Sequence, residues 1–198
     1  MDSIRHACAV LTIVGYPPVL VFWLLVHPFV GFWRAVGPGL TYTATLAAMA
    51  GVGVALYGFR DNILATEYGA RGPLMALSAV AMGLSAAIEV ACRRKLDAAT
   101  LVGVPELTAR GRVGRLLQDG VYARVRHPRY VSGAFGVIAL ALFTNYLAVY
   151  IIAAVYFPVI HLVTVLEEQE LADRFGEEYR RYARRVPRFI PRRRRPVE

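Results

Sequence analysis

Cysteine is scarce in this sequence, which has only Cys8 and Cys92 among its 198 residues. Both lie within or at the end of apolar stretches, so the sequence excludes a disulfide framework and a Cys-x-x-Cys metal motif. Cysteine and histidine also form no cluster at the spacing of metal ligands, and we therefore expect no bound metal. We expect both cysteines to be packing residues.

Charge is missing from long parts of the chain. Hydrophobic residues make up 57 % of the sequence, and the mean hydropathy is +0.45. These values are too apolar for an ordinary soluble domain and are typical of a polytopic membrane protein, here with a single membrane domain over residues 1–198. The net charge is +9, but the basic residues are clustered, which favours contact with anionic lipid headgroups over binding of nucleic acid.

Long apolar segments predict the helices. A helix needs about 20 apolar residues to cross the hydrocarbon core, and three segments of the N-terminal part, residues 1–92, meet this criterion: 7–30, 40–59 and 73–92. The apolar run 131–166 is nearly twice as long as one crossing, so it predicts a helical hairpin that reverses near Thr144, Asn145 and Tyr146. The expected fold is all-α, with about five transmembrane helices.

Lysine and arginine are concentrated in the predicted loop 93–130 and after residue 166. With five spans, both segments lie on the same face of the membrane, which the positive-inside rule assigns to the cytoplasm. The spacing of apolar residues in 167–191 predicts an amphipathic helix along the cytoplasmic interface. Residues 192–198 form a polybasic tail suited to anionic lipid headgroups.

Charged groups crowd against both ends of the predicted hairpin. The stretch RVRHPRY precedes its first helix, and Glu167 and Glu168 follow its second. Both ends of a hairpin return to the same membrane surface, so these two carboxylates are expected to lie opposite several guanidinium groups. Such a site can bind a zwitterionic or cationic cofactor.

Two motifs resemble those of the isoprenylcysteine carboxyl methyltransferases and the related phospholipid methyltransferases. They are DGVYARVRHPRY and EEQELADRFGEEYRRYARRVPRFIP, and the resemblance covers residues 119–191. Val121 stands where the family often has proline, and Ser132 where glycine is usual. The resemblance implies a membrane methyltransferase that uses S-adenosyl-L-methionine, with six residues as candidates for binding this cofactor: Tyr122, His127, Pro128, Tyr130, Glu167 and Glu168.

The acceptor expected from this resemblance is a lipophilic or lipidated molecule that enters from the bilayer. A carboxylate acceptor, as in isoprenylcysteine, needs no general base but must be held, for which the fork of arginine is suited. Arg126 and Arg185 are the candidates for this catalytic role. Three alternatives remain open at this point: N-methylation of a phospholipid amine, an NADPH-dependent enzyme like the membrane sterol reductases, and a non-enzymatic membrane scaffold.

Overall fold

The computed structural model describes residues 1–26, 28–95 and 115–191. The middle of the predicted loop 93–130 and the predicted polybasic tail 192–198 lie outside these ranges. The described residues form helices, connected by turns and short extended segments: α1 (Asp2–Val26), α2 (Val30–Val36), α3 (Pro38–Gly58), α4 (Arg60–Ile63), α5 (Gly72–Arg93), the 3₁₀ turn η1 (Gly120–Ala123), α8 (Pro128–Thr144), α9 (Leu147–Phe175) and α10 (Glu177–Arg185).

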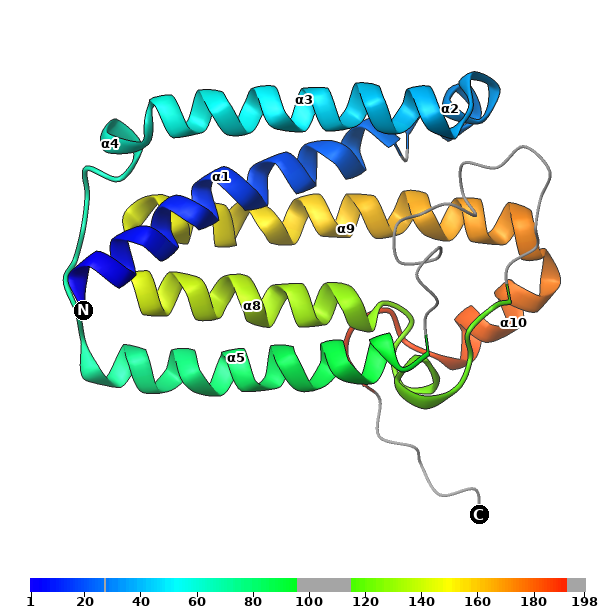
Figure 1. The fold of residues 1–198 in the computed structure, drawn as a ribbon. Helices are drawn as coiled ribbons and strands as arrows, with labels where there is room; N and C mark the ends of the chain where they lie inside the picture. The colour runs from blue at the N-terminus through cyan, green and yellow to red at the C-terminus, as the bar shows by residue number, and fades with distance from the viewer. Residues whose placement is uncertain (27, 96–114, 192–198) are drawn as a thin grey trace, which may run out of the picture.

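The long helices run side by side (Figure 1). Within the described ranges, four of them, α1, α3, α5 and α9, are long and apolar enough to cross a membrane, and α8 is a shorter apolar helix. The predicted all-α, polytopic membrane fold is therefore confirmed. α9 continues without a break through Glu167 and Glu168 to Phe175, so the polar segment begins as an extension of the last apolar helix.

The reversal between α8 and α9 occurs at the predicted residues. Asn145 follows α8 with a φ of 56°, in the left-handed region that asparagine tolerates better than most residues. Its side-chain amide donates to the carbonyl of Gly69 at 2.8 Å, and its side-chain oxygen accepts from the Tyr150 hydroxyl at 2.9 Å. This asparagine therefore both ends the helix and ties the turn to the segment before α5.

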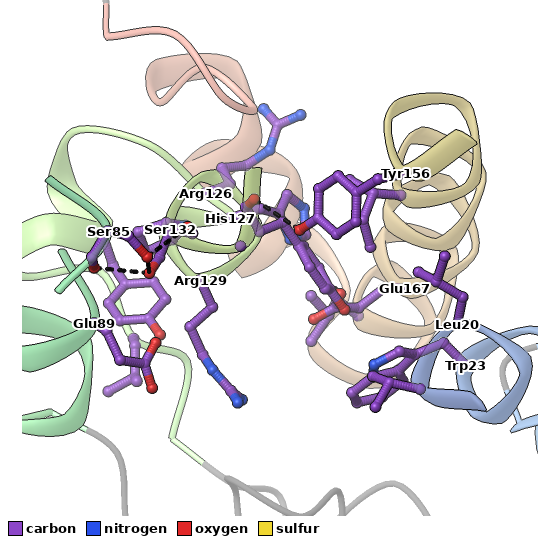
Figure 2. Close-up of a pocket in the computed structure, with 18 of the residues that line it drawn as sticks. Leu20, Trp23, Ser85, Glu89, Arg126, His127, Arg129, Ser132, Tyr156 and Glu167 are labelled. Carbon is purple, nitrogen blue, oxygen red and sulfur yellow. Dashed lines mark hydrogen bonds and ion pairs between the residues drawn. The ribbon is translucent and has the colours of Figure 1, made fainter. Parts of the chain in front are cut away.

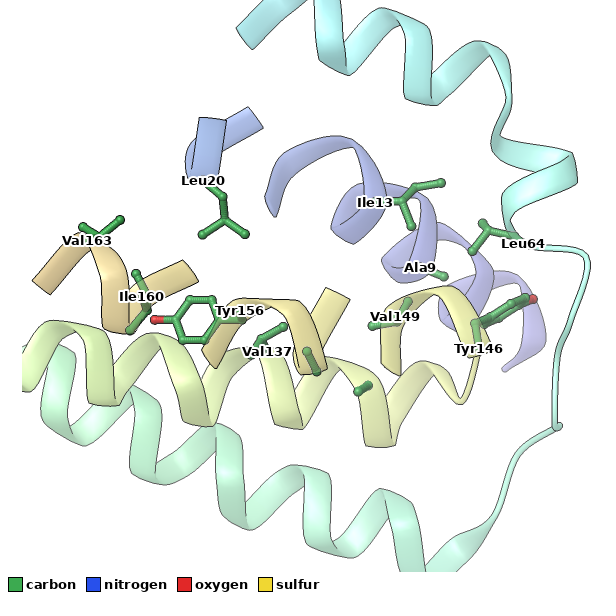
Figure 3. Close-up of a cluster of buried hydrophobic side chains, with 12 residues drawn as sticks. Ala9, Ile13, Leu20, Leu64, Val137, Tyr146, Val149, Tyr156, Ile160 and Val163 are labelled. Atoms are coloured by element: carbon green, nitrogen blue, oxygen red, sulfur yellow. The ribbon is translucent and has the colours of Figure 1, made fainter. Parts of the chain in front are cut away.

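Two packed groups of helices form the bundle. α5 packs most extensively on α8, and α1 packs on α3 and on α9. Buried apolar side chains fill the space between α1, α8 and α9, including Ile13, Val137, Val149 and Val163 (Figure 3). On the other side of α8, the Ser78 hydroxyl donates to the carbonyl of Ala139 at 2.8 Å, a bond that small residues permit because the helices approach closely.

A buried arginine closes the end of the bundle at which α1 begins. The Arg5 side chain is fully buried and pairs with Glu67 at 2.9 Å and with Asp2 at 3.0 Å. It also donates to the carbonyls of Phe143, at 3.4 Å, and Thr144, at 2.7 Å. This network joins α1, the segment before α5 and the end of α8, so the guanidinium is compensated by charge and by hydrogen bonds.

At the opposite end, Gly176 redirects the chain. It adopts a φ of 57° after α9, a conformation that glycine allows without a steric cost. α10 then turns back beside the end of α9 (Figure 1), where Tyr179 and Tyr182 are buried. The residues that follow α10 are thereby brought to the loop before α8.

Candidate active site

A cavity of about 790 Å³ lies among α1, α5, α8, α9 and α10. Its volume falls in the range of small-molecule and cofactor sites, which is about 300–1,000 Å³. Figure 2 shows Glu89 and Arg129 on the side of α5 and α8, and Glu167, Trp23 and Leu20 on the side of α9 and α1. Charged side chains therefore line the cavity on both of these groups of helices.

Beside the cavity, Glu168 is the centre of a cluster that we call the carboxylate clamp, formed by Glu168, Arg126, His127 and Arg188. Glu168 accepts from Arg126 at 2.8 and 3.0 Å and from Arg188 at 2.6 and 3.0 Å. The His127 Nε2 atom lies 2.9 Å from the same carboxylate. Two guanidinium groups and an imidazole thus surround one half-buried carboxylate, which ties three chain segments together.

Backbone contacts reinforce the carboxylate clamp. The amide groups of Arg126 and His127 donate to the carbonyls of Pro187 and Arg188, at 2.9 and 3.2 Å. The Arg126 Nη1 atom donates to the carbonyls of Ala183 and Val186, both at 2.7 Å. Arg126 therefore makes four side-chain hydrogen bonds inside the protein, which hold the Arg-His-Pro segment against the chain after α10.

The cavity wall contains polar groups without partners. Three residues that line it have buried polar atoms with no hydrogen-bond partner in the described part of the chain: Glu167 (Oε2), Arg174 (Nε and Nη1) and Tyr179 (hydroxyl). The His127 Nδ1 atom lies 3.6 Å from Glu167 Oε2, beyond hydrogen-bond distance. Buried polar groups of native proteins are normally paired, so this set indicates a ligand.

Tyrosine side chains complete the polar lining. Tyr122 and Tyr179 both line the cavity, and both lie outside the membrane-spanning segments. Burial raises the pKa of each hydroxyl above its usual value, and the charge of the nearby Glu168 raises the pKa of Tyr179 further. Both hydroxyls are therefore protonated near neutral pH, and that of Tyr179, which has no hydrogen-bond partner in the described residues, is available as a donor.

Most of the residues predicted from the sequence meet at this cavity. Five of the six candidates for cofactor binding line it, together with Arg126: Tyr122, His127, Pro128, Tyr130 and Glu167. Glu168, the sixth, is absent from the lining and belongs to the carboxylate clamp. Arg185 is exposed and donates to the Gln118 side chain at 3.2 Å, so it is not brought to the cavity beside Arg126.

Sequence reasoning missed several lining residues. Arg174 follows Glu167 by seven residues on α9, which puts both on one helical face, so helical spacing offered a signal for it. Tyr179 lies in the second motif but was not singled out as a ligand-binding residue. Arg129 and Trp23 line the cavity as well but were not among the candidates, Trp23 because the apolar run 7–30 gives no signal for a ligand-binding residue.

The lining suits S-adenosylmethionine. This cofactor carries an ammonium, a carboxylate, ribose hydroxyls and a sulfonium. The atoms of Glu167, Arg174 and Tyr179 that lack hydrogen-bond partners supply an acceptor for the ammonium and donors for the carboxylate and the ribose hydroxyls. Aromatic residues also line the cavity, among them Trp23, Tyr130 and Tyr156. Aromatic ring faces attract cations such as a sulfonium and stack on planar bases.

Known proteins with similar sequences include two metal-resistance proteins and a methyltransferase. The chain is 34 % identical over 77 residues to the nickel-cobalt-cadmium resistance protein NccN of Alcaligenes xylosoxydans xylosoxydans, covering 39 % of this chain and 36 % of the relative. It is 37 % identical, over the same length and shares, to the cobalt-zinc-cadmium resistance protein CzcN of Cupriavidus metallidurans.

The third relative is the protein-S-isoprenylcysteine O-methyltransferase of Schizosaccharomyces pombe, 35 % identical over 79 residues, which are 38 % of this chain and 33 % of the relative. The matches thus span about a third of the length of these curated relatives. No solved structure matches the chain.

A family model covers a longer stretch than these pairwise matches. The model described as phospholipid methyltransferase matches residues 74–178, slightly more than half of the chain. The matched range extends from α5 to the start of α10 and includes both the carboxylate clamp's glutamate and the unpaired groups of α9. The chain therefore belongs to the phospholipid methyltransferase family, which includes the isoprenylcysteine methyltransferases.

Proposed function

We propose that this membrane methyltransferase uses S-adenosylmethionine to methylate a lipophilic acceptor that enters the cavity from the bilayer. The observation that carries the proposal is that Glu167 and Arg174, on one face of α9 in the cavity wall, both have buried polar atoms with no hydrogen-bond partner in the described residues. These groups match the ammonium and the carboxylate of the cofactor's amino-acid part. Glu167 binds the ammonium, and Arg174 binds the carboxylate.

A binding measurement tests the cofactor. Purified protein in detergent is titrated calorimetrically with S-adenosylhomocysteine, the product form of the cofactor, and separately with NADPH. We expect S-adenosylhomocysteine to bind and NADPH not to bind, because the Glu167 carboxylate offers an acceptor for the ammonium of S-adenosylhomocysteine, a group that NADPH lacks. Binding of NADPH alone would overturn the proposal in favour of a reductase.

The acceptor's route is proposed to pass between α1 and α5. Leu11 and Val19 of α1 and Met82 of α5 line the cavity and are also exposed on the outside of the bundle. In a membrane-spanning segment, such exposed apolar side chains face lipid tails. A lipophilic acceptor can therefore reach the cavity from the bilayer without crossing water.

For the acceptor's reacting group, we propose a carboxylate held by Arg129. This arginine is half-buried, lines the cavity on the α5 side, and makes no hydrogen bond or ion pair with the residues that the structure describes. In the transfer, the carboxylate oxygen bonds to the methyl carbon as the carbon–sulfur bond breaks, and that bond's electron pair stays on sulfur. The opposite charges of oxygen and sulfonium cancel, no proton is released, and the shielded cavity favours the step.

A phospholipid amine is the second candidate, because the Glu89 carboxylate lines the same side of the cavity as Arg129. The two candidate acceptors lead to opposite expectations for the effect of substitutions at Arg129 and Glu89 on turnover. With an S-prenylcysteine as acceptor, Arg129→Gln should reduce turnover far more than Glu89→Gln, and with phosphatidylethanolamine in mixed micelles the order should reverse. Turnover of phosphatidylethanolamine alone would overturn the carboxylate acceptor while leaving the cofactor proposal intact.

The proposed orientation has the carboxylate clamp on the cytoplasmic side, as the distribution of basic residues predicts. Single cysteines test this in a chain that carries Cys8→Ser and Cys92→Ser. Ala123→Cys reports the clamp's end and Tyr68→Cys the opposite end, and both positions are exposed. In intact cells, a membrane-impermeant maleimide should label the cysteine at 68 only. Labelling at 123 instead would invert the orientation.

A further inference from the structure

A second carboxylate on α9 lies between two arginines. The Glu170 Oε1 atom is 2.6 Å from Arg34 Nη2, on α2, and 3.8 Å from Arg174 Nη1, one turn further along α9. The Glu170 and Arg174 side chains are largely buried, with 11 % and 17 % of their surface exposed. Arg34 thus makes a short ion pair with this carboxylate, whereas Arg174 lies just beyond hydrogen-bond distance of the same oxygen.

The unequal distances explain why Arg174 keeps free donors. A carboxylate one helical turn before an arginine normally pairs with it, and such a pair would occupy guanidinium N–H groups. Here the Nε and Nη1 atoms of Arg174 have no hydrogen-bond partner in the described residues, although the side chain lines the cavity. The bond from Arg34 therefore holds Glu170 away from the group that faces the ligand.

The short helix α2 is anchored so that it can present Arg34. The indole nitrogen of Trp33 donates to the carbonyl of Leu25 in α1 at 2.8 Å. α2 also packs against α3, and it lies at the same end of the bundle as the polar extension of α9 (Figure 1). A fixed α2 holds the Arg34 guanidinium in place at little further entropic cost.

Charge leads to the same conclusion as geometry. Arg34 and Arg174 around one Glu170 leave a net charge of about +1 beside the cavity, which attracts an anionic group. Without Arg34 the remaining pair is neutral, and Glu170 is then the partner of Arg174. The loss of positive charge and the pairing of Glu170 with Arg174 both lower the affinity of the cavity for a carboxylate.

We propose that Arg34 is a positioning residue: by holding Glu170, it keeps the Arg174 guanidinium available to the carboxylate of the cofactor's amino-acid part. The inference rests on the proposed function. It adds a residue outside the cavity, on a helix before the two sequence motifs, that controls affinity for one chemical group of the ligand.

The test compares Arg34→Gln with Arg34→Gln/Glu170→Gln. Calorimetry with S-adenosylhomocysteine should show about 10-fold weaker binding for Arg34→Gln, and recovery to within about 3-fold of wild type when Glu170→Gln is added, because the competing carboxylate is then neutral. Glu170→Gln alone should bind at least as tightly as wild type. Arg60→Gln, on α4 at the opposite end of the bundle, is the matched control and should have no effect.

A second probe separates positioning from a general structural role. Methylthioadenosine lacks the cofactor's ammonium and carboxylate, so its affinity, measured by competition, should be the same in wild type and Arg34→Gln. Equal weakening of both probes, or failure of the double variant to recover, would overturn the inference while leaving the proposed function standing. An unchanged affinity in Arg34→Gln would do the same. If the wild-type chain does not bind S-adenosylhomocysteine, the proposed function fails, and the inference fails with it.

Discussion

The two ends of the bundle each contain a buried arginine, and the two arginines differ in how many of their nitrogens have hydrogen-bond partners. At one end, Arg5 is fully buried and has partners for its side chain in Asp2, Glu67 and two backbone carbonyls. At the other end, Arg174 is largely buried, but two of its nitrogens have no hydrogen-bond partner in the described residues. An arginine whose nitrogens all have hydrogen-bond partners stabilises a fold, whereas one in a cavity wall with nitrogens that lack such partners is available to a ligand.

The same contrast separates the adjacent carboxylates of α9. Glu168 is surrounded by the donors of the carboxylate clamp, while Glu167 turns an unpaired oxygen toward the cavity. Neighbouring residues on a helix point about 100° apart, so two identical side chains in sequence can serve different surroundings. The comparison predicts that changes to paired groups lower stability and that changes to unpaired groups lower ligand affinity.

The largest effect is expected at Arg5. Arg5→Met should lower the free energy of unfolding by about 3–5 kcal/mol, because it removes a fully buried guanidinium that pairs with Glu67 and donates to the carbonyls of Phe143 and Thr144. Thermal unfolding in detergent measures this change. The fraction that remains folded should bind S-adenosylhomocysteine as wild type does. A loss of affinity in proportion to the loss of stability would contradict the assignment of Arg5 to stability alone.

Substitutions of the adjacent Glu167 and Glu168 should have different effects on stability and on ligand binding. Glu168→Gln should cost about 2–3 kcal/mol of stability, since hydrogen bonds from charged donors lose their charged acceptor. Glu167→Gln should cost less than about 1 kcal/mol but weaken S-adenosylhomocysteine binding by about 10- to 100-fold. Unfolding curves and calorimetry on the same two preparations provide the measurement. The reverse pattern would exchange the roles of the two residues.

A smaller effect is expected where α8 approaches α9 at the cavity. A Cβ at Gly133 would overlap the Tyr156 hydroxyl, which donates to the carbonyl of Tyr130 at 2.9 Å. Gly133→Ala should therefore displace Tyr156 and destabilise the protein by about 1–2 kcal/mol. Gly51→Ala on α3, where nothing lies within 4 Å of the added atom, is the matched control and should be neutral or slightly stabilising.

The smallest effect is expected at Arg185. Its exposed side chain donates to Gln118 at 3.2 Å and does not line the cavity, so Arg185→Ala should change stability by less than about 0.5 kcal/mol and leave S-adenosylhomocysteine binding unchanged. The sequence-based assignment of Arg185 to the acceptor predicts instead a loss of turnover. Steady-state rates with an S-prenylcysteine, compared with those of Arg129→Gln, distinguish the two expectations.

Much of the architecture followed from local pattern. Apolar runs of the right length predicted α1, α3 and α5, and the run after residue 130 predicted a hairpin whose reversal is at Asn145. The apolar run ends at residue 166 because hydropathy falls at Glu167, whereas the helix continues to Phe175. Hydropathy reports the membrane's edge, but a helix ends only where its backbone bonding is interrupted, here at Gly176.

The sequence by itself determined that this is an all-helical membrane protein and that the Arg-His-Pro segment meets the Glu-Glu pair at one end of a hairpin. Helical spacing and motif identity carry that information because both are local. Only the tertiary structure decided which of those side chains hydrogen-bond to one another and which keep donors or acceptors for a ligand. Arg126 and Glu168 bind each other in the carboxylate clamp, and Glu167 and Arg174 are left to the cavity, because hydrogen-bond saturation depends on atoms that distant segments bring within about 3 Å.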